Sequence, residues 1–302
     1  SISLNDKLGP TMTISSTTVN SGETSNDSTI SLTFTSSEST TNFIKDDITI
    51  SGGSLSSLSG SGTTYTATLT QSGDATYTIS VAQNKFTDSS GNNNSASNTF
   101  SWTYDSTAPT ITGVTLASDN TTMTVTFSEA VYNTNSGSGS LEVSDFVFAL
   151  SGGTATLSST TPSSISINGN EYTLGISLSG TPNGSETLTV NPVSSSIFDL
   201  AGNVASTSQS NNSISLNDKL APTITGVTLA SDNSTITVTF SETVWNYDVN
   251  SSGSLEVTDF VFELSGGTAS LSSTTPSSIS INGTEYTLGI SLSGTPNGSE
   301  TL

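Results

Sequence analysis

The chain contains no cysteine and no histidine, and only four of its 302 residues are lysine or arginine. Without cysteine it has no disulfides, no thiolate nucleophile and no zinc–thiolate site. Without histidine it lacks the usual general base near neutral pH and the commonest transition-metal ligand. No serine lies three positions before a lysine, which excludes the Ser-x-x-Lys arrangement of some hydrolases. We therefore expect that the chain is not an enzyme.

The scarcity of positive charge excludes two classes of partner. The chain has 25 acidic residues and a net charge of −21, and its lysines are scattered along the sequence. No basic stripe is present to neutralise phosphates, so we expect no nucleic-acid binding and no docking on an anionic membrane. No apolar run approaches the roughly 20 residues of a membrane-spanning helix. A high net charge of one sign instead favours a soluble chain that resists edge-to-edge strand association.

Internal repeats dominate what is present. Residues 108–120 recur unchanged as 221–233, and residues 174–188 recur as 288–302. Residues 1–8 match 213–220. A more distant copy of the repeat lies between Pro10 and Ala108. Repeats of this length predict a tandem array. We predict a last strand of a preceding module at 1–8, module 1 at 9–107, module 2 at 108–220, and module 3, cut short at its C-terminus, at 221–302.

Within one module the pattern is that of β-strands. Hydrophobic residues make up only 31% of the chain, but they alternate with threonine and serine. The predicted strands of module 2 are 111–116, 122–127, 146–150, 164–167, 172–178, 187–190 and 213–216. No window has a helical period. Seven short strands in about 110 residues predict an all-β protein of tandem immunoglobulin-like β-sandwich modules.

Three short motifs occur in the same order in successive modules. They are a linker Asp-x-x-Ala-Pro-Thr at 105–110 and 218–223, Phe-Ser-Glu at 127–129 and 240–242, and Asp-x-x-Gly-Asn at 199–203 with a relative at 88–92. In this the chain resembles the bacterial Ig-like domain repeats of large repetitive surface adhesins and biofilm-associated proteins. The resemblance implies a linear, rod-like array outside the cell, often stiffened by calcium at module junctions.

The carboxylates themselves also predict calcium. In such a sandwich the incoming linker and the loops after the second and sixth strands lie at one end, so the acidic residues of the three motifs converge there. Carboxylates that repel one another are the oxygen ligands that Ca²⁺ prefers. The candidate ligands are Asp6, Glu38 and Asp88 at the first junction, Asp105, Glu129 and Asp199 at the second, and Asp218 and Glu242 at the third. The alternative is that these residues form only ordinary turns.

Aromatic residues leave a second question open. Trp102 and Tyr104 lie in the last predicted strand of module 1, and Tyr132 and Trp245 occupy one equivalent position in modules 2 and 3. Each either stacks on a sugar ring or covers the end of a core.

The sequence thus predicts a structural stalk or adhesin segment of a large extracellular bacterial surface protein, acting in cell adhesion or biofilm cohesion. The expected partners are neighbouring copies of the same repeat or protein, and a cell-surface glycan or protein receptor. Two alternatives stay open: a subunit of a self-assembling filament or sheath, and an accessory carbohydrate-binding module of a secreted enzyme.

Overall fold

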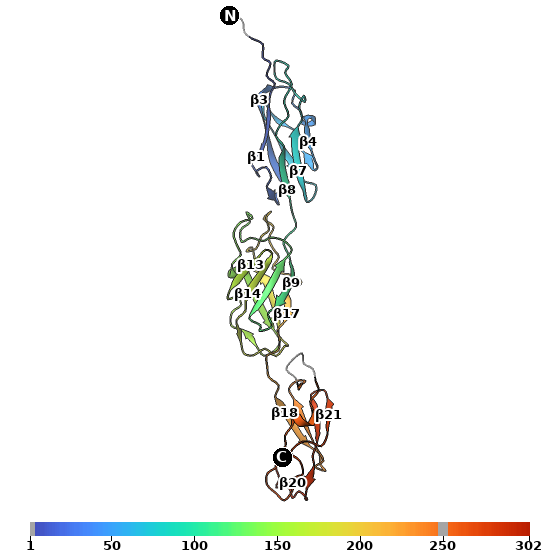
Figure 1. Ribbon diagram of the computed structural model, residues 1–302. Helices are drawn as coiled ribbons and strands as arrows, with labels where there is room; N and C mark the ends of the chain where they lie inside the picture. The colour runs from blue at the N-terminus through green and yellow to red at the C-terminus, as the bar shows by residue number, and fades with distance from the viewer. Residues whose placement is uncertain (1–3, 247–252) are drawn as a thin grey trace. The chain divides into compact units, whose positions relative to one another are not determined.

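The computed structural model describes residues 4–246 and 253–302, and their regular structure is β-strand apart from three short 3₁₀ turns (Figure 1). The chain divides into two compact units, Ser1–Lys219 and Leu220–Leu302. Two separate hydrophobic cores lie in the first unit and one in the second. Each core falls within the range of one predicted module, so we keep the names module 1, module 2 and module 3.

Module 1 is a sandwich of two four-stranded sheets, with strand orders β1-β3-β6-β5 and β2-β8-β7-β4. Its strands are β1 (Met12–Ser16), β2 (Thr24–Ser25), β3 (Thr29–Thr40), β4 (Ile48–Ile50), β5 (Ser54–Leu55), β6 (Ser59–Thr70), β7 (Ala75–Val81) and β8 (Phe100–Tyr104). Alternate residues of β3 face the core, and the buried cross-strand pairs with β6 are Ile30–Leu69, Leu32–Ala67 and Phe34–Tyr65. Burying each large apolar side chain stabilises the fold by about 1.5–3 kcal/mol.

Module 2 packs the sheet β13-β14-β10-β9 against the sheet β11-β16-β17, with a further pair β12-β15. Its strands are β9 (Ile111–Leu116), β10 (Thr122–Phe127), β11 (Phe146–Ser151), β12 (Thr156–Leu157), β13 (Ile165–Asn168), β14 (Glu171–Gly175), β15 (Leu178–Ser179), β16 (Thr187–Pro192) and β17 (Ser213–Ser215). The alternating pattern therefore predicted the main strands of this module to within about two residues.

One predicted strand of module 2 was wrong in detail. Residues 172–178 do not form a single strand: β14 pairs with β10 and β13, whereas β15 pairs with the unpredicted β12. The change of partner occurs at Gly175, where an added Cβ would lie 2.4 Å from the Ser163 hydroxyl oxygen. A side chain at that position would push the crossing segment away.

Module 3 repeats the first sheet of module 2 as β18 (Ile224–Leu229), β19 (Thr235–Phe240), β22 (Glu285–Gly289) and β21 (Ile279–Asn282), in that order. A second pair joins β20 (Ser270–Leu271) to β23 (Leu292–Ser293). Ser265 and Thr301 form an isolated bridge, at the positions that correspond to Ser151 and Thr187 in module 2.

A three-residue 3₁₀ turn directly precedes β4 in module 1 and β11 in module 2, and a third occurs at the equivalent position in module 3. They are η1 (Lys45–Asp47), η2 (Val143–Asp145) and η3 (Val257–Asp259). In each, the last aspartate accepts a hydrogen bond from a backbone N–H three residues earlier, as Asp145 does from Glu142 at 2.7 Å. The predicted strand at 1–8 is partly outside the described residues; residues 4–8 are not in a strand.

Candidate metal centres

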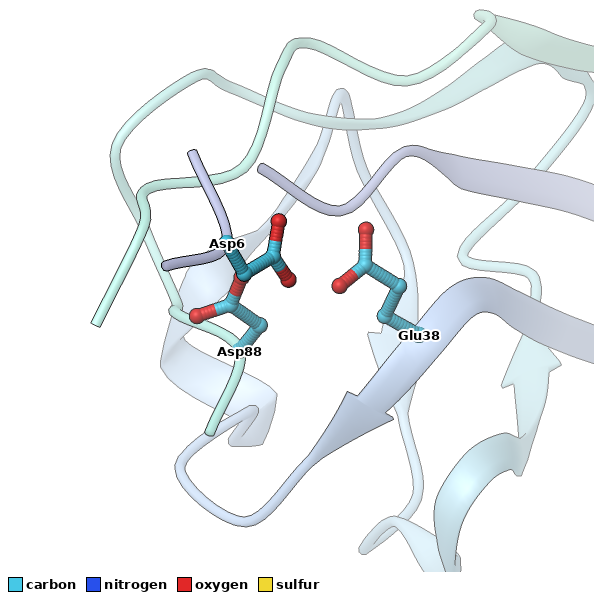
Figure 2. Close-up of side chains that lie close together, drawn as sticks. All are labelled: Asp6, Glu38 and Asp88. Atoms are coloured by element: carbon cyan, nitrogen blue, oxygen red, sulfur yellow. The ribbon is translucent and has the colours of Figure 1, made fainter. Parts of the chain in front are cut away.

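Two groups of three carboxylates lie at equivalent places, one at the start of module 1 and one at the start of module 2. The first group, called cluster 1, is Asp6, Glu38 and Asp88, and the second, called cluster 2, is Asp105, Glu129 and Asp199. In each cluster one carboxylate oxygen from each residue lies within 4.8 Å of the others. Figure 2 shows the three side chains of cluster 1 directed toward one another. Six of the eight predicted ligands are therefore brought together.

The remaining pair, Asp218 and Glu242, falls on two different units. Asp218 lies one residue before the end of the first unit, and Glu242 follows β19 in the second. A third junction site built from these residues stays a prediction.

Each cluster draws its members from three separate parts of the chain. In cluster 2, Asp105 directly follows β8, Glu129 lies two residues beyond β10, and Asp199 lies in the loop between β16 and β17. In cluster 1, Asp6 lies in the segment before β1, Glu38 in β3, and Asp88 in the loop between β7 and β8. The sandwich topology alone brings these segments to one end of a module.

The Asp-x-x-Gly-Asn motif forms a turn that fixes the direction of its own aspartate. The Asp199 carboxylate accepts hydrogen bonds from the Asn203 backbone N–H and from its side-chain amide, both at 2.8 Å. Gly202 has a positive φ of 91°, which suits glycine. Asp88 accepts the same two bonds from Asn92, at 2.8 and 2.9 Å. The motif is thus a turn, and that turn places its carboxylate in the cluster.

Burial is graded within the clusters. The Asp199 side chain is fully buried and Asp88 is 7% exposed, whereas the two glutamates are half-buried and Asp6 is exposed. A carboxylate placed deep while its neighbours reach solvent makes a site that is open on one side. The buried oxygens are held by the turn and the outer ones can adjust to a ligand.

The electrostatics of the two glutamates show that like charges gather here. Burial raises the pKa of Glu129, and the negative charges of Asp199 and Asp105 raise it further, against a smaller lowering by a hydrogen bond from Ser128. Burial likewise raises the pKa of Glu38, and its cluster partners Asp6 and Asp88 add to the effect.

The pKa of Asp88 in cluster 1 is shifted in the opposite direction. Burial alone raises the pKa of Asp88, but hydrogen bonds from Asn92, Ser90 and Gly91 outweigh it and hold that pKa below its usual range. The aspartate is therefore a fixed negative charge, and the glutamate beside it is the group that resists ionisation.

This arrangement is suited to a hard divalent cation. Each cluster offers carboxylate oxygens and neither nitrogen nor sulfur, which is the donor set of Ca²⁺ or Mg²⁺ rather than of zinc or copper. Ca²⁺ takes six to eight oxygens in variable geometry, so backbone carbonyls and water can complete a shell begun by three carboxylates.

Several residues that shape cluster 2 were missed from the sequence. Asn26 and Asp74, both in module 1, contact the loop or the linker of the cluster. The Asn203 side-chain oxygen accepts a hydrogen bond from the Asn26 side-chain amide at 3.2 Å. Nothing in the motifs of module 2 points to a partner 177 residues away, so only the fold reveals it.

The aromatic residues are now resolved in part. Trp102 is fully buried, stacks on Tyr77 with ring centroids 5.4 Å apart, and donates its indole N–H to the Ser25 hydroxyl at 3.0 Å. Trp102 is therefore a core residue, which is the second of the two alternatives that the sequence left open. Trp245 is 46% exposed, which leaves its role open.

Comparison with known proteins gives a family match within the first module. Residues 6–104 match the model of a family described as bacterial Ig-like domain. This family consists of structural, non-enzymatic modules, in agreement with the expectation from composition. No curated protein matches the sequence significantly. Within residues 4–246 and 253–302, no helix has the length and hydropathy needed to cross a bilayer.

Several solved structures are similar to the chain at low identity. The Escherichia coli adhesin FdeC gives a TM-score of 0.37 at 14% identity, over 93% of this chain and 88% of that one. Invasin, a bacterial integrin-binding protein, gives 0.30 at 14% identity, over 94% and 54%. The N-terminal part of the bacterial S-layer protein SbsC gives 0.23 at 17% identity, over 70% and 44%. This chain therefore spans about half of the invasin chain and less than half of the SbsC chain.

Proposed function

Because residues 6–104 form a bacterial Ig-like domain and two further immunoglobulin-like modules follow it, we propose that the chain is a stalk segment of an extracellular bacterial surface adhesin. Its work is mechanical: it holds a binding element away from the cell, or joins cells through neighbouring copies. Calcium bound at the carboxylate clusters stiffens the junctions between modules. The observation that carries this proposal is the occurrence of the same three-carboxylate cluster at the start of two successive modules.

The position of the clusters supports a role at junctions. Asp105 lies in the linker between modules 1 and 2, whereas Glu129 and Asp199 belong to module 2. An ion bound by all three therefore joins the linker to the module. Without the ion, mutual repulsion of the carboxylates favours a linker that moves away.

The concentration of calcium outside cells suits such a site. Extracellular modules bind Ca²⁺ with dissociation constants of about 10⁻⁴–10⁻³ M, and such sites fill outside a cell but stay empty at cytosolic calcium levels. The negative charge of the chain adds a general attraction for cations. A segment that needs calcium to stiffen would thus become stiff only after export.

Magnesium is the closest competitor. It prefers six near-octahedral oxygens at about 2.0–2.1 Å and loses its water reluctantly. Three carboxylates on different segments, one of them exposed, match the more variable shell of calcium better.

The test is a calorimetric titration of the whole chain with Ca²⁺, beside a variant carrying Glu38→Gln and Glu129→Gln. Saturable binding that the double variant loses at both clusters supports the proposal. Equal heats in both proteins would exclude the clusters as the binding sites. A parallel titration with Mg²⁺ tests the choice of ion.

The mechanical part needs a second measurement. Small-angle X-ray scattering of the whole chain in chelator and in calcium reports the spread of maximum dimensions. We expect a narrower distribution in calcium for the wild-type chain and no change for the double variant. Electron microscopy of the same samples tests polymerisation: ordered polymers would favour the filament alternative over a stalk.

A further inference from the structure

Cluster 2 is held from both sides, and one side is module 1. The linker that carries Asp105 is bonded to module 1 at two points. The Asp105 backbone N–H donates to the Ser25 carbonyl at 3.2 Å. The Asp74 carboxylate accepts hydrogen bonds from the Ser106 N–H at 3.0 Å, the Ser106 hydroxyl at 2.8 Å and the Thr107 hydroxyl at 3.0 Å.

These bonds fix the linker immediately beyond the candidate ligand. Thr107 also donates its backbone N–H to the Asp105 carboxylate at 2.9 Å. Asp74 therefore holds the same residue that orients the Asp105 side chain. The hydrogen bonds from Ser106 and Thr107 lower the pKa of Asp74, so it is ionised and accepts them as strong bonds at neutral pH.

The loop that carries Asp199 is bonded to module 1 as well. The Asn26 backbone N–H donates to the Ala201 carbonyl at 3.1 Å, and the Asn26 side-chain amide donates to the Asn203 side-chain oxygen at 3.2 Å. The Asn203 amide in turn donates to the Asp199 carboxylate at 2.8 Å and to the Asp105 carbonyl at 3.0 Å. One asparagine thus connects module 1, the linker and the buried carboxylate.

Asn26 has a firm base in module 1. It directly follows β2, whose Ser25 pairs with Tyr104 of β8 and accepts the indole N–H of the fully buried Trp102 at 3.0 Å. Asn26 and the preceding Ser25 therefore reach the loop and the linker, respectively, from one anchored position. The geometry is that of a preformed holder rather than of two surfaces that happen to touch.

We infer that Asn26 and Asp74 are positioning residues for the calcium ion bound at cluster 2. Module 1 thereby sets the affinity of a site in which Glu129 and Asp199 belong to module 2. The inference rests on the proposed calcium site. Neither residue is a ligand; each holds a segment that carries one. Outer-shell partners of metal ligands typically change metal affinity by about 10–100-fold when removed.

Reciprocity gives a second consequence. If contact with module 1 strengthens ion binding, then ion binding strengthens that contact by the same factor. The ion then acts on the Asn26 backbone N–H, which lies in module 1 and is bonded to Ala201 of module 2.

Cluster 1 supplies an internal control. Asn26 lies just before the start of β3, whereas Glu38 lies near its other end. At about 3.3 Å per residue the part of β3 from Thr29 to Glu38 alone spans about 30 Å. In a chain that keeps Glu38 but carries Glu129→Gln and Glu242→Gln, substitution of Asn26 or Asp74 should therefore leave calcium binding at cluster 1 unchanged.

The experiment uses the whole chain with Glu38→Gln and Glu242→Gln, so that cluster 2 is titrated alone with CaCl₂. Into this background go Asp74→Ala, Asp74→Asn, Asn26→Ala and, as a matched control in the same region, Glu23→Gln. The Glu23 carboxylate accepts hydrogen bonds from the backbone and side chain of Asn20, and no described hydrogen bond joins it to the linker.

We expect Asp74→Ala and Asn26→Ala to weaken calcium binding roughly tenfold. Asp74→Asn should retain most of the affinity, because its amide oxygen still accepts from Ser106 and its amide nitrogen can donate to the Thr107 hydroxyl. Glu23→Gln should bind like the background. Equal losses in Asp74→Asn and Asp74→Ala would overturn positioning in favour of a simple charge effect.

Hydrogen exchange of the unsubstituted chain provides an independent readout. Calcium should slow exchange of the Asn26 amide by about the factor by which Asn26→Ala weakens binding. No change in that amide would overturn the coupling. A background protein that binds no calcium would refute the site itself, whereas normal binding with unaffected Asp74→Ala and Asn26→Ala variants would refute only the role of module 1.

Discussion

Replacing Glu129 by glutamine should make the ion-free protein more stable and at the same time abolish the response of module 2 to calcium. The pKa of Glu129 is raised by burial and by Asp199 and Asp105, so the folded state holds the proton more tightly than the unfolded state does. Above its ordinary pKa near 4.5, stability therefore falls as pH rises through the raised value. At pH 7 the folded protein carries the full cost of an unfavourable charge.

The size of that cost follows from the geometry. Two unit charges within 4.8 Å repel by about 1 kcal/mol in bulk water and about 3.5 kcal/mol at an effective dielectric constant of 20. The charge on Glu129 takes part in two of the three such pairs in cluster 2. Because the side chain is half-buried and can turn toward solvent, we expect Glu129→Gln to recover about 1–2 kcal/mol. For a module of about 100 residues this raises the melting temperature by about 5–10 °C.

The assay is differential scanning calorimetry of the whole chain at pH 7 in chelator and in calcium. Hydrogen exchange of β10 and β14 identifies the transition that belongs to module 2. The matched control is Glu171→Gln, which removes one exposed negative charge from the same module. The gain should shrink as the pH falls and disappear well below pH 4.5, where Glu129 is protonated in both states.

Two results would refute this reasoning. If Glu129→Gln is no more stable in chelator than Glu171→Gln, the carboxylates of cluster 2 do not repel appreciably in the folded state. If the Glu129→Gln protein still gains as much stability from calcium as the wild type, the ion binds elsewhere.

Three further outcomes are expected. Lowering the pH toward the raised pKa of Glu129 should weaken calcium binding at cluster 2 and make that binding release protons. Calorimetry in buffers of different ionisation enthalpy detects the released protons, and a pH-independent affinity would contradict this expectation. Glu186→Gln should destabilise module 2 at pH 7 by about 2–4 kcal/mol, because the fully buried carboxylate accepts backbone hydrogen bonds at 2.7 and 3.0 Å, and the difference from wild type should shrink below pH 4.5; urea unfolding measures both. Acrylamide should quench the half-exposed Trp245 and spare Trp102, so that Trp245→Phe leaves a blue-shifted, protected emission; strong quenching of that variant would show that module 1 is open.

Hydrogen bonding, rather than burial, decides the direction in which the pKa of Glu186 is shifted. Burial by itself raises its pKa, but the backbone N–H groups of Ala155, Thr154 and Asn183 outweigh burial and lower it. Its counterpart Glu300 in module 3 accepts the same kind of bonds, and its pKa is lowered to about 2. Since the folded pKa is depressed, the stability that each carboxylate contributes is present above pH 4.5 and is lost as the pH falls through the folded value.

Module 1 solves the same packing problem differently. In module 1, Tyr77 lies against Gly53, whereas in module 2 Glu186 lies against Gly153. Its hydroxyl donates to the Gly73 carbonyl at 2.6 Å and accepts the Ser72 N–H at 2.8 Å. Acid should therefore affect this part of module 1 less than the equivalent part of module 2, because a tyrosine hydroxyl does not gain a proton in this range.

Much of the fold was within reach of the sequence because strand formation depends on local alternation. Residues 111–116 and 122–127 read as apolar residues alternating with threonine, and the structure has β9 and β10 with those bounds. The interruption at Gly175 was not within reach, because it depends on which strands lie on either side of the crossing segment.

The grouping of the candidate carboxylates was predictable from the sequence, but their surroundings were not. Duplicated motifs marked Asp105, Glu129 and Asp199 as equivalent to Asp6, Glu38 and Asp88, and topology placed each set at one end of a module. The same motifs could not separate a turn from a candidate ligand, since the Asp-x-x-Gly-Asn turn itself places its aspartate in the cluster.

By itself, the sequence determined the class of the protein. Its lack of histidine and cysteine, its scarcity of positive charge, its alternation of apolar and polar residues and its repeats are the features that indicate this class. They depend only on composition and period, which need no partner in space. Tertiary structure alone decided three other things: that Trp102 is buried rather than exposed, that Glu186 lies fully enclosed among backbone N–H groups, and that Asn26 reaches Asn203. Each of these depends on contacts between residues far apart in the chain. Burial and hydrogen bonding are properties of the neighbours that folding supplies, and a side chain's own identity does not specify them.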